Sequence, residues 1–411
     1  MAFSILVGLI LLVPPTVDNL SRLIFYKDGI QFCKSEALNF VINSSEISAE
    51  RTSVVFYIEN DSISHPGLDF KYTNKDQKLI LIRGGKGLGI SPFYNSYHQL
   101  EMFFEALYWK VGDPVMQFGA LFGSSDSSAH FDSFNYFDKN VYETLTGGGV
   151  NPLIKIKAYA KKVASSELDL TGLATSLGKT KQSAEIDLYK LTTSGFITYD
   201  KEREKIFVKE KLYHYINARK RKEDYDAVVV NSQARVNAVL NLKSKDLKIN
   251  GVRKFTLSKA QFVKVYPDNK SVIVKKNRDM EFSGILNAGK TEYFGSLYKF
   301  SYDDFKVDLY ECDSMRLRVR NTGNSGPPQI RLGSTIEGIR GEVLLDDPQN
   351  KSGIDTSIND YPKVNCTKKT FVFYDKKSIQ RGAYNRDDFK FILEPFTMDS
   401  LDNFTTAGVE F

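Results

Sequence analysis

Ser, Asp and His residues stand close together in the segment GSSDSSAHFDS, residues 123–133, and these are the residue types of a hydrolase triad. A serine nucleophile usually needs a strained turn such as Gly-x-Ser-x-Gly, and this segment does not contain that pattern. Triad members can lie far apart in a sequence, so a hydrolase without a recognisable motif stays open as an interpretation. Residues 115–137, which include this segment, predict strand and turn, and we assign no catalytic residue.

Two glycine-containing segments partly match phosphate-binding loops. The segment LGKT, residues 177–180, matches the end of a P-loop, but the pattern requires glycine where Leu173 stands. The segment GGKGLG, residues 84–89, follows a predicted strand, but it does not fit Gly-x-Gly-x-x-Gly, and Pro92 lies where a helix would begin. We therefore predict neither a nucleotide site nor any other cofactor site.

Residue types that bind metal ions are present without metal-ligand spacing. The four histidines are scattered along the chain, at His65, His98, His130 and His214. The segment DDPQNKSGID, residues 346–355, could offer Asp346, Asp347 and Asp355 to a cation, but it lacks the spacing of a twelve-residue calcium loop. We predict a polar turn there and no metal site.

The composition of the 411 residues is that of an ordinary folded protein of two to four domains, with 42% hydrophobic and 26% charged residues. The 29 Phe and 22 Tyr favour β-structure. Three cysteines, Cys33, Cys312 and Cys366, form neither a disulfide framework nor a zinc-ligand set, although one bridge between Cys312 and Cys366 is conceivable.

Short apolar runs bounded by turn residues predict the elements that would position these groups. Residues 20–83 contain LIFY, LNFVI, SVVFYI, LDFKY and KLILI, and residues 227–320 contain such runs about every ten residues. This spacing leaves no room for crossover helices, so it excludes a βαβ architecture. We predict a mainly β fold of short, stacked antiparallel strands, arranged as a sandwich or solenoid, with an inserted α+β module.

Helical spacing interrupts the strands twice before residue 150. In residues 95–111 the apolar positions recur at helical intervals and predict an amphipathic helix with an aromatic face. Those positions are Leu100, Phe103, Phe104, Leu107 and Tyr108. The segment NYFDKNVYETLTGGG predicts a second, shorter helix, which Gly147 to Gly149 would end.

Residues 151–222 predict helices followed by a hairpin. The segments NPLIKIKAYAKKVAS and LTGLATSLG predict two helices, Gly178 makes a turn, and a third helix runs from about Lys181 to Thr193. Gly195 ends this helix, FITYD and KIFVK form the hairpin, and EKLYHYINARKRKEDYD closes the segment as a helix.

Residues 153–212 resemble a winged helix-turn-helix, through Leu188, Leu191, Gly195, Phe196 and Ile197. The resemblance implies that the third helix could enter a DNA major groove. Its candidate nucleic-acid contacts are Lys181, Gln182, Tyr189 and Thr192. Glu185 and Asp187 on the same helix do not suit a polyanion, and the predicted wing, DKEREK, is charge-balanced. Many winged helices serve instead as protein contacts or spacers.

The charge of the chain is concentrated near this module. Residues 151–220 contain fourteen Lys or Arg against eight Asp or Glu, an excess equal to the net charge of +6 for the whole chain. A basic patch can attract nucleic acid or anionic lipid, and more often it is a solvated face.

The segment MEFSGILNAGKTEYFGSLYKFSYDDFKVDLYECDSMRLRV is similar to the stacked strands of bacterial envelope β-jellyroll and β-taco proteins. Together with HPGLDFKYTNKDQKLILIRG and SPFYNSYHQLEMFFEALYW, it makes the chain resemble part of large uncharacterised envelope proteins. The resemblance implies a periplasmic, outer-membrane-associated or secreted location, and no site residue follows from it.

An apolar run from Ala2 to Val13 begins the chain and stops at Pro14 and Pro15, so it is too short to span a membrane as a helix. We interpret it as a signal or anchor remnant, although no Lys or Arg precedes Arg22, or else as a buried strand or the start of a truncated reading frame.

The predicted regions follow from these patterns. They are an apolar N-terminal segment (1–19), a β-rich region (20–94), a mixed connector (95–150), a winged-helix-like module (151–222), a strand-repeat region (223–320) and a loop-rich C-terminal β region (321–411). The leading hypothesis is a non-catalytic structural or interaction protein of a bacterial envelope, with protein or envelope components as partners and no small-molecule ligand. The alternatives are a cytoplasmic nucleic-acid-binding protein and the hydrolase without a motif.

Overall fold

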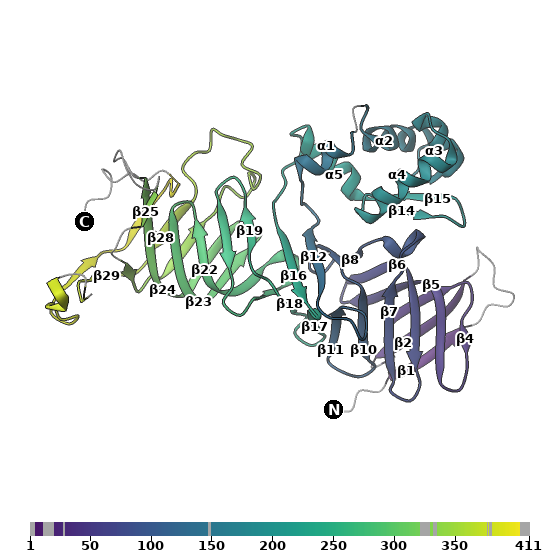
Figure 1. The fold of residues 1–411 in the computed structure, drawn as a ribbon, viewed down its shortest axis with the longest axis horizontal. Helices are drawn as coiled ribbons and strands as arrows, with labels where there is room; N and C mark the ends of the chain where they lie inside the picture. Colours follow the sequence, from purple (N-terminus) through teal and green to yellow (C-terminus); the bar gives the residue numbers. More distant parts are fainter. Residues whose placement is uncertain are drawn as a thin grey trace. The chain divides into compact units, whose positions relative to one another are not determined.

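A computed structural model describes residues 5–10, 20–27, 29–146, 149–320, 329–331, 335–375, 377 and 380–402. The chain forms two compact units, one of Met1–Glu223 with Ser232–Asn250 and the other of Asp224–Asn231 with Gly251–Phe411. Most elements are antiparallel strands, and the helices are concentrated in one segment of the first unit (Figure 1). The predicted mainly β fold with an inserted helical segment is confirmed.

The strands of the first unit pair mostly in chain order. They are β1 (Ile5–Ile10), β2 (Ser21–Lys27), β3 (Ile30–Ala37), β4 (Val41–Ile42), β5 (Glu46–Ile58), β6 (Asp61–Thr73), β7 (Lys78–Arg83), β8 (Phe93–Asn95), β9 (Leu100–Phe103), β10 (Ala106–Lys110), β11 (Val115–Gly119), β12 (Ser127–Ser133), β17 (Val236–Asn241) and β18 (Leu247–Asn250). One half of β6 continues the sheet through β7, β10, β11, β17 and β18, and the other half continues it through β8, β9 and β12. The long strand β6 therefore belongs to two branches of the sheet.

Trp109 of β10 marks the core of the first unit. Its ring lies 6.4 Å from Phe25 of β2, 5.1 Å from Phe32 of β3 and 6.3 Å from Phe56 of β5, measured between centroids. Strand β10 pairs with β7 and β11, so these contacts are made through side chains. The two parts of the sheet thus face each other across an aromatic core.

The predicted helix over residues 95–111 is wrong. These residues form the end of β8, a turn, and strands β9 and β10. All four residues of β9 are buried. Its apolar residues Met102 and Phe103 are followed by buried Phe104, and such neighbouring apolar positions fit a helical period as well as a strand period. Gln99 ends the turn in the left-handed conformation, with φ of 55°, which a continuous helix would not allow.

The part of the N-terminal apolar run that the structure describes is strand β1. It pairs with β2 from Ile5 opposite Lys27 to Ile10 opposite Arg22. This agrees with the strand interpretation for residues 5–10, whereas the remainder of the run lies outside the described residues. Among the described residues, no helix combines the length and apolar character needed to cross a membrane.

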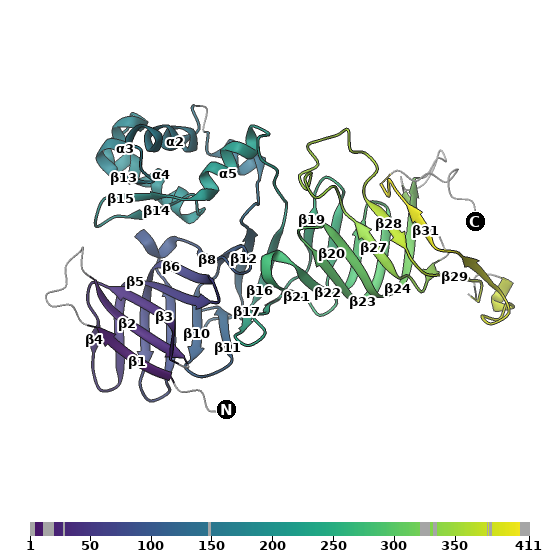
Figure 2. The ribbon, with the colours of Figure 1, turned by 180° about the vertical axis from the view of Figure 1, so that it is seen from behind.

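The helical module, residues 151–222, contains the predicted order of elements. They are α2 (Pro152–Val163), β13 (Glu167–Asp169), α3 (Leu170–Leu177), α4 (Lys181–Thr193), β14 (Ile197–Asp200), β15 (Lys205–Val208) and α5 (Glu210–Arg219), and α1 (Lys139–Thr144) precedes them. Asn151, Asp169 and Thr180 cap α2, α3 and α4 through side-chain oxygens. Figure 2 shows the helices beside the small β13–β15–β14 sheet.

The second unit is a succession of strands, most of them of two to four residues, with three longer ones of 9, 11 and 15 residues. They are β19 (Phe255–Ser258), β20 (Val263–Tyr266), β21 (Ser271–Val274), β22 (Met280–Ala288), β23 (Thr291–Ser301), β24 (Lys306–Arg320), β25 (Gln329–Arg331), β26 (Ile336–Glu337), β27 (Gly341–Leu344), β28 (Lys363–Cys366), β29 (Thr370–Phe373), β30 (Lys390–Leu393) and β31 (Phe396–Met398). Strand β16 (Val229–Ala234) has residues in both units. Short 3₁₀ turns lie at η1 (Gly87–Ile90), η2 (Lys276–Arg278) and η3 (Gln380–Gly382).

Alternation along the strands of the second unit agrees with the sequence pattern. Val272 and Val274 are buried, whereas Ile273 and Lys275 are partly exposed. The C-terminal region, residues 321–411, predicted as loop-rich β-structure, contains the paired strands β27 and β28. The conceivable disulfide is absent, since Cys312 and Cys366 are both free, buried thiols.

Candidate functional site

A buried group of charges, the Lys211 cluster (Lys211, Glu101 and Asp132), joins the helical module to the strands of the first unit. Glu101 on β9 and Asp132 on β12 are 4% and 8% exposed and stand directly opposite each other in the strand register. Lys211 on α5 forms an ion pair with Glu101, and its ammonium nitrogen lies 4.0 Å from the Asp132 carboxylate. One cation from the module therefore lies against two carboxylates of the sheet.

Burial dominates the protonation of Glu101. Desolvation raises the pKa of this carboxyl group to about 6, although the adjacent Lys211 ammonium opposes the rise. The negative charge of Asp132 adds to the increase. A carboxyl group with such a pKa can exchange a proton near neutral pH, as a general acid or base does.

Gly195, which follows α4, allows the module to approach Glu101 closely. Its φ is +79°, in the left-handed region that favours glycine. A Cβ atom at this position would lie 2.8 Å from the nearer carboxylate oxygen of Glu101. The same glycine therefore ends the helix and makes room for the buried carboxylate.

Aromatic rings surround the ammonium group of Lys211. Its nitrogen lies 5.9 Å from the ring centroid of Phe103, 5.6 Å from that of Phe196 and 6.0 Å from that of Tyr215. At such distances ring faces stabilise a cation. The rings also exclude water, so this ion pair is far less screened than one at the surface.

A cleft of about 530 Å³ lies beside the Lys211 cluster, and its walls include Tyr94, Glu101, Lys209, Lys211 and His214. His214 has partners at both ring nitrogens, since Nδ1 lies 2.8 Å from a Glu223 carboxylate oxygen and Nε2 lies 2.9 Å from the Asn135 carbonyl oxygen. Lys209 lies 4.6 Å from the ring centroid of Tyr94, and burial lowers its pKa. The charged groups of the cleft thus bind one another and the backbone.

The segment that suggested a triad lies partly in strand β12, where its residues have separate partners. The His130 ring stacks on Phe103 with centroids 4.1 Å apart, and burial lowers its pKa. The Ser127 hydroxyl donates to Asn237. Asp132 belongs to the Lys211 cluster, so His130, Ser127 and Asp132 each contact a different group.

The predicted nucleic-acid contacts on α4 are not all exposed. Lys181 pairs with Glu204 at 2.7 Å, and Gln182 is exposed beside it. Tyr189 packs edge-on against Tyr199, with centroids 5.8 Å apart. The expectation that Thr192 faces outward is wrong: its side chain is buried, and its hydroxyl donates to the carbonyl of Leu188 one turn earlier.

The two glycine-containing segments, LGKT and GGKGLG, have structural roles. Gly178 ends α3 in the left-handed conformation with φ of 70°, and the Thr180 hydroxyl accepts from the backbone N–H of Ser183 at the start of α4. The segment LGKT is therefore the joint between two helices. The GGKGLG loop leads into η1, which lies against β6, α4 and β14.

The candidate cation ligands in residues 346–355 bond to protein groups. The Asp346 carboxylate accepts from the Gln261 amide at 2.6 Å and from the Asn350 amide at 3.2 Å. Asp355 accepts from Ser357 at 2.6 Å. Within the described part of the chain, no group of three or more His, Cys, Asp or Glu has the geometry of a metal site.

No protein-family model, curated protein or solved structure matches this chain. The sequence patterns missed the Lys211 cluster, although one signal was present: Glu101 is a single carboxylate within the apolar run LEMFF. A charge in such a run has to be paired if the run is buried.

Proposed function

We propose that this chain is a non-catalytic structural or interaction protein in which residues 151–222 form a winged-helix module fixed to the strands of the first unit. The observation that supports this most directly is Lys211, because its buried ammonium group lies against two carboxylates of the sheet. Gly195 of the module also lies so close to Glu101 that a Cβ atom there would be 2.8 Å from the carboxylate, so the module and the sheet are closely packed at this point. Such a module serves better as a fixed part of a scaffold than as a mobile reader.

The charges around α4 support the same proposal. Lys179 pairs with Asp187, Lys181 pairs with Glu204, and the Tyr199 hydroxyl donates to Glu185 at 2.8 Å. A phosphate backbone would have to displace these carboxylates from the cations, and it would approach the carboxylates themselves. The face that a DNA-binding winged helix uses is therefore poorly suited to a polyanion.

The envelope location belongs to the same proposal. It is supported by the resemblance of the sequence to stacked-strand envelope proteins and by the antiparallel strands of the second unit. Partners would then be other proteins or components of the envelope.

A distance measurement between two spin labels tests the fixed module. Exposed Lys162 on α2 and Lys71 on β6 are replaced by cysteine, while the native cysteines are buried and react slowly. We expect a single narrow distance distribution, which broadens when Lys211→Met is added. A broad distribution in the chain with native Lys211 would show a hinged module and overturn the proposal.

A second candidate function is nucleic-acid binding through another surface. Residues Arg219 to Lys222 form an exposed run of four cations at the end of α5. Binding through this run would be weak, independent of sequence and steeply weakened by salt. Fluorescence anisotropy with duplex DNA distinguishes binding by this run from binding by α4. The double variant Lys220→Ala with Arg221→Ala would reduce binding by the run, and the double variant Lys181→Ala with Gln182→Ala would not. Sequence-selective binding lost in the latter variant would favour the α4 surface instead.

A further inference from the structure

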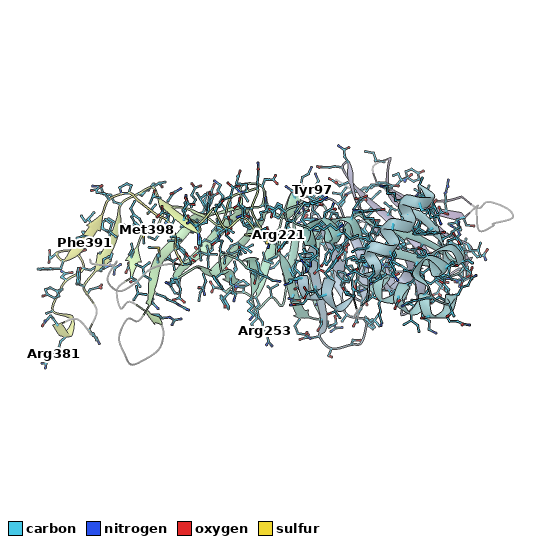
Figure 3. All side chains as sticks on the ribbon, turned by 90° about the horizontal axis from the view of Figure 1, so that it is seen from above. Tyr97, Arg221, Arg253, Arg381, Phe391 and Met398 are labelled. Atoms are coloured by element: carbon cyan, nitrogen blue, oxygen red, sulfur yellow. The ribbon has the colours of Figure 1, made fainter. Side chains whose placement is uncertain are left out.

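Strand β30 of the second unit has one open side. It pairs with β29 from Thr370 opposite Leu393 to Phe373 opposite Lys390, and among the described residues the register gives it no second strand. Phe391 is 44% exposed and Ile392 is 47% exposed. In Figure 3, Phe391 lies at the end of this unit, farther out than Met398.

The exposure of β30 is unusual because it affects both faces of the strand. Neighbouring side chains of a strand point to opposite faces, so Phe391 and Ile392 expose apolar surface on each. Within the described part of the chain, no strand pairs with the backbone groups on this side, so they can pair with another chain. Strands of this kind associate with other strands unless charges or proline block them.

The residues of β30 and the one that follows are complementary to a second copy of themselves. In an antiparallel pair centred on Ile392, Lys390 stands opposite Glu394 of the other copy, and Phe391 stands opposite Leu393. Opposite charges then flank an apolar centre on both sides, an arrangement that stabilises strand pairs. Pro395 has no N–H group and would end the ladder after Glu394.

We propose that two copies of this chain associate through their β30 strands, paired antiparallel about a two-fold axis at Ile392. The geometry is isologous, so each copy supplies the same surface and the assembly closes at two. Glu394 already contacts a lysine, Lys369, at 2.7 Å, and both side chains are largely exposed. The carboxylate is thus placed at the surface where the partner's Lys390 would reach it.

The association is expected to be weak because one pair of short strands buries little surface. Stable interfaces bury about 1,200–2,000 Å². We therefore expect the full chain to sediment as a monomer at low micromolar concentration and as a dimer at several hundred micromolar. A monomer over the whole range would overturn the proposal.

Charge exchange tests the register. Lys390→Glu places like charges opposite each other at two symmetric positions, so the dissociation constant should rise about tenfold. The double variant Lys390→Glu with Glu394→Lys restores opposite charges and should return it to the original value. Lys264→Glu on β20 is the control, since this exposed lysine carries the same charge change on another strand. Failure of the double variant to restore dimerisation, or an equal loss with Lys264→Glu, contradicts the register.

Cross-linking tests the axis independently. With Ile392→Cys, the two introduced thiols would face each other at the spacing of directly opposed strand residues, which suits a disulfide. A mild added oxidant that accepts the two electrons and two protons should therefore link the copies. Phe389→Cys, exposed but three positions from the axis, should not cross-link. Equal cross-linking of both variants would show that the contact is not centred on Ile392.

Discussion

Glu101 and Asp132 face each other directly across β9 and β12, and the same lysine of α5, Lys211, lies against both. Like charges directly opposite in a sheet repel each other, and burial strengthens the repulsion. The two strands can carry these residues inside the unit because the helical module supplies the cation. The stable pairing of β9 with β12 therefore depends on the docking of α5.

Removal of this cation should destabilise the first unit. Lys211→Met keeps the length and apolar contacts of the side chain but leaves two buried carboxylates, so unfolding should become easier by about 3–5 kcal/mol. The single tryptophan, Trp109, lies in the core of this unit and reports its unfolding by fluorescence. The control is Lys205→Met, whose pair with Glu167 is exposed and should matter by less than about 1 kcal/mol. Equal effects would contradict the role of burial.

Glu101 should give the first unit a pH dependence of defined sign. Its pKa is about 6 in the folded protein against the ordinary 4.5, so the folded form binds this proton more tightly. The stabilisation is present below about pH 4.5 and is lost as the pH rises through 6, by about 2 kcal/mol. Comparing wild type with Glu101→Gln across this range isolates the effect. A difference between the two that does not change with pH would refute it.

Two buried histidines should make the folded protein less stable as the pH falls, which is opposite to the effect of Glu101. Burial lowers the pKa of His65 to about 3 and that of His98 to about 4, below the ordinary 6.5. The unfolded chain then binds these protons more tightly, and each residue costs about 2 kcal/mol of stability as the pH falls from 7 to 5. His98→Gln should remove its share of the acid-induced loss. Denaturant unfolding at the two pH values measures it, and an unchanged loss would contradict the prediction.

Gly195 should tolerate no side chain. In Gly195→Ala the new Cβ meets the Glu101 carboxylate in addition to the strain of a positive φ, so we expect a loss of about 2–4 kcal/mol. Gly178→Ala has a similar φ of +70° with open space around the Cβ position, and should cost only about 1 kcal/mol. Thermal unfolding of both variants separates close contact from backbone strain, since equal losses would leave strain as the sole cause.

Buried and exposed residues of α4 should respond differently to substitution by alanine. Leu191 on α4 is 1% exposed, so Leu191→Ala should destabilise the module by about 2–5 kcal/mol and make residues 153–212 sensitive to protease. Ile186 on the same helix is 59% exposed, and Ile186→Ala should change little. Unchanged protease resistance of the Leu191 variant would mean that α4 does not pack as described.

Much of the fold could be predicted from the sequence because the spacing of apolar side chains within each helix or strand is a local pattern. The helices of residues 151–222 and the alternation of Val272, Ile273 and Val274 follow from side-chain spacing alone. The segment around Leu100 and Phe103 could not be assigned correctly, because a run of neighbouring apolar residues fits both periods and only tertiary burial decides between them.

The Lys211 cluster could not be predicted for a different reason. Glu101, Asp132 and Lys211 are each ordinary surface residue types, and they come from three elements far apart in the chain. Their burial depends on how α5 docks, which leaves no periodic mark in the sequence. The burial of Thr192 could not be predicted for the same reason. The packing of α4 against its neighbours decides which face of this helix is buried.

The pairing of β11 with β17 has a consequence for biosynthesis. Met116 pairs with Leu240, and the Ser127 hydroxyl donates to Asn237, a residue 110 positions later, so the whole helical module is made before this part of the sheet can close. Contacts between such distant residues slow folding because a long loop must be ordered first. During synthesis on the ribosome, the edge of β11 that pairs with β17 would stay unpaired while the helices, whose contacts are local, assemble. The inserted module would then already be folded when the last strands of its own unit arrive.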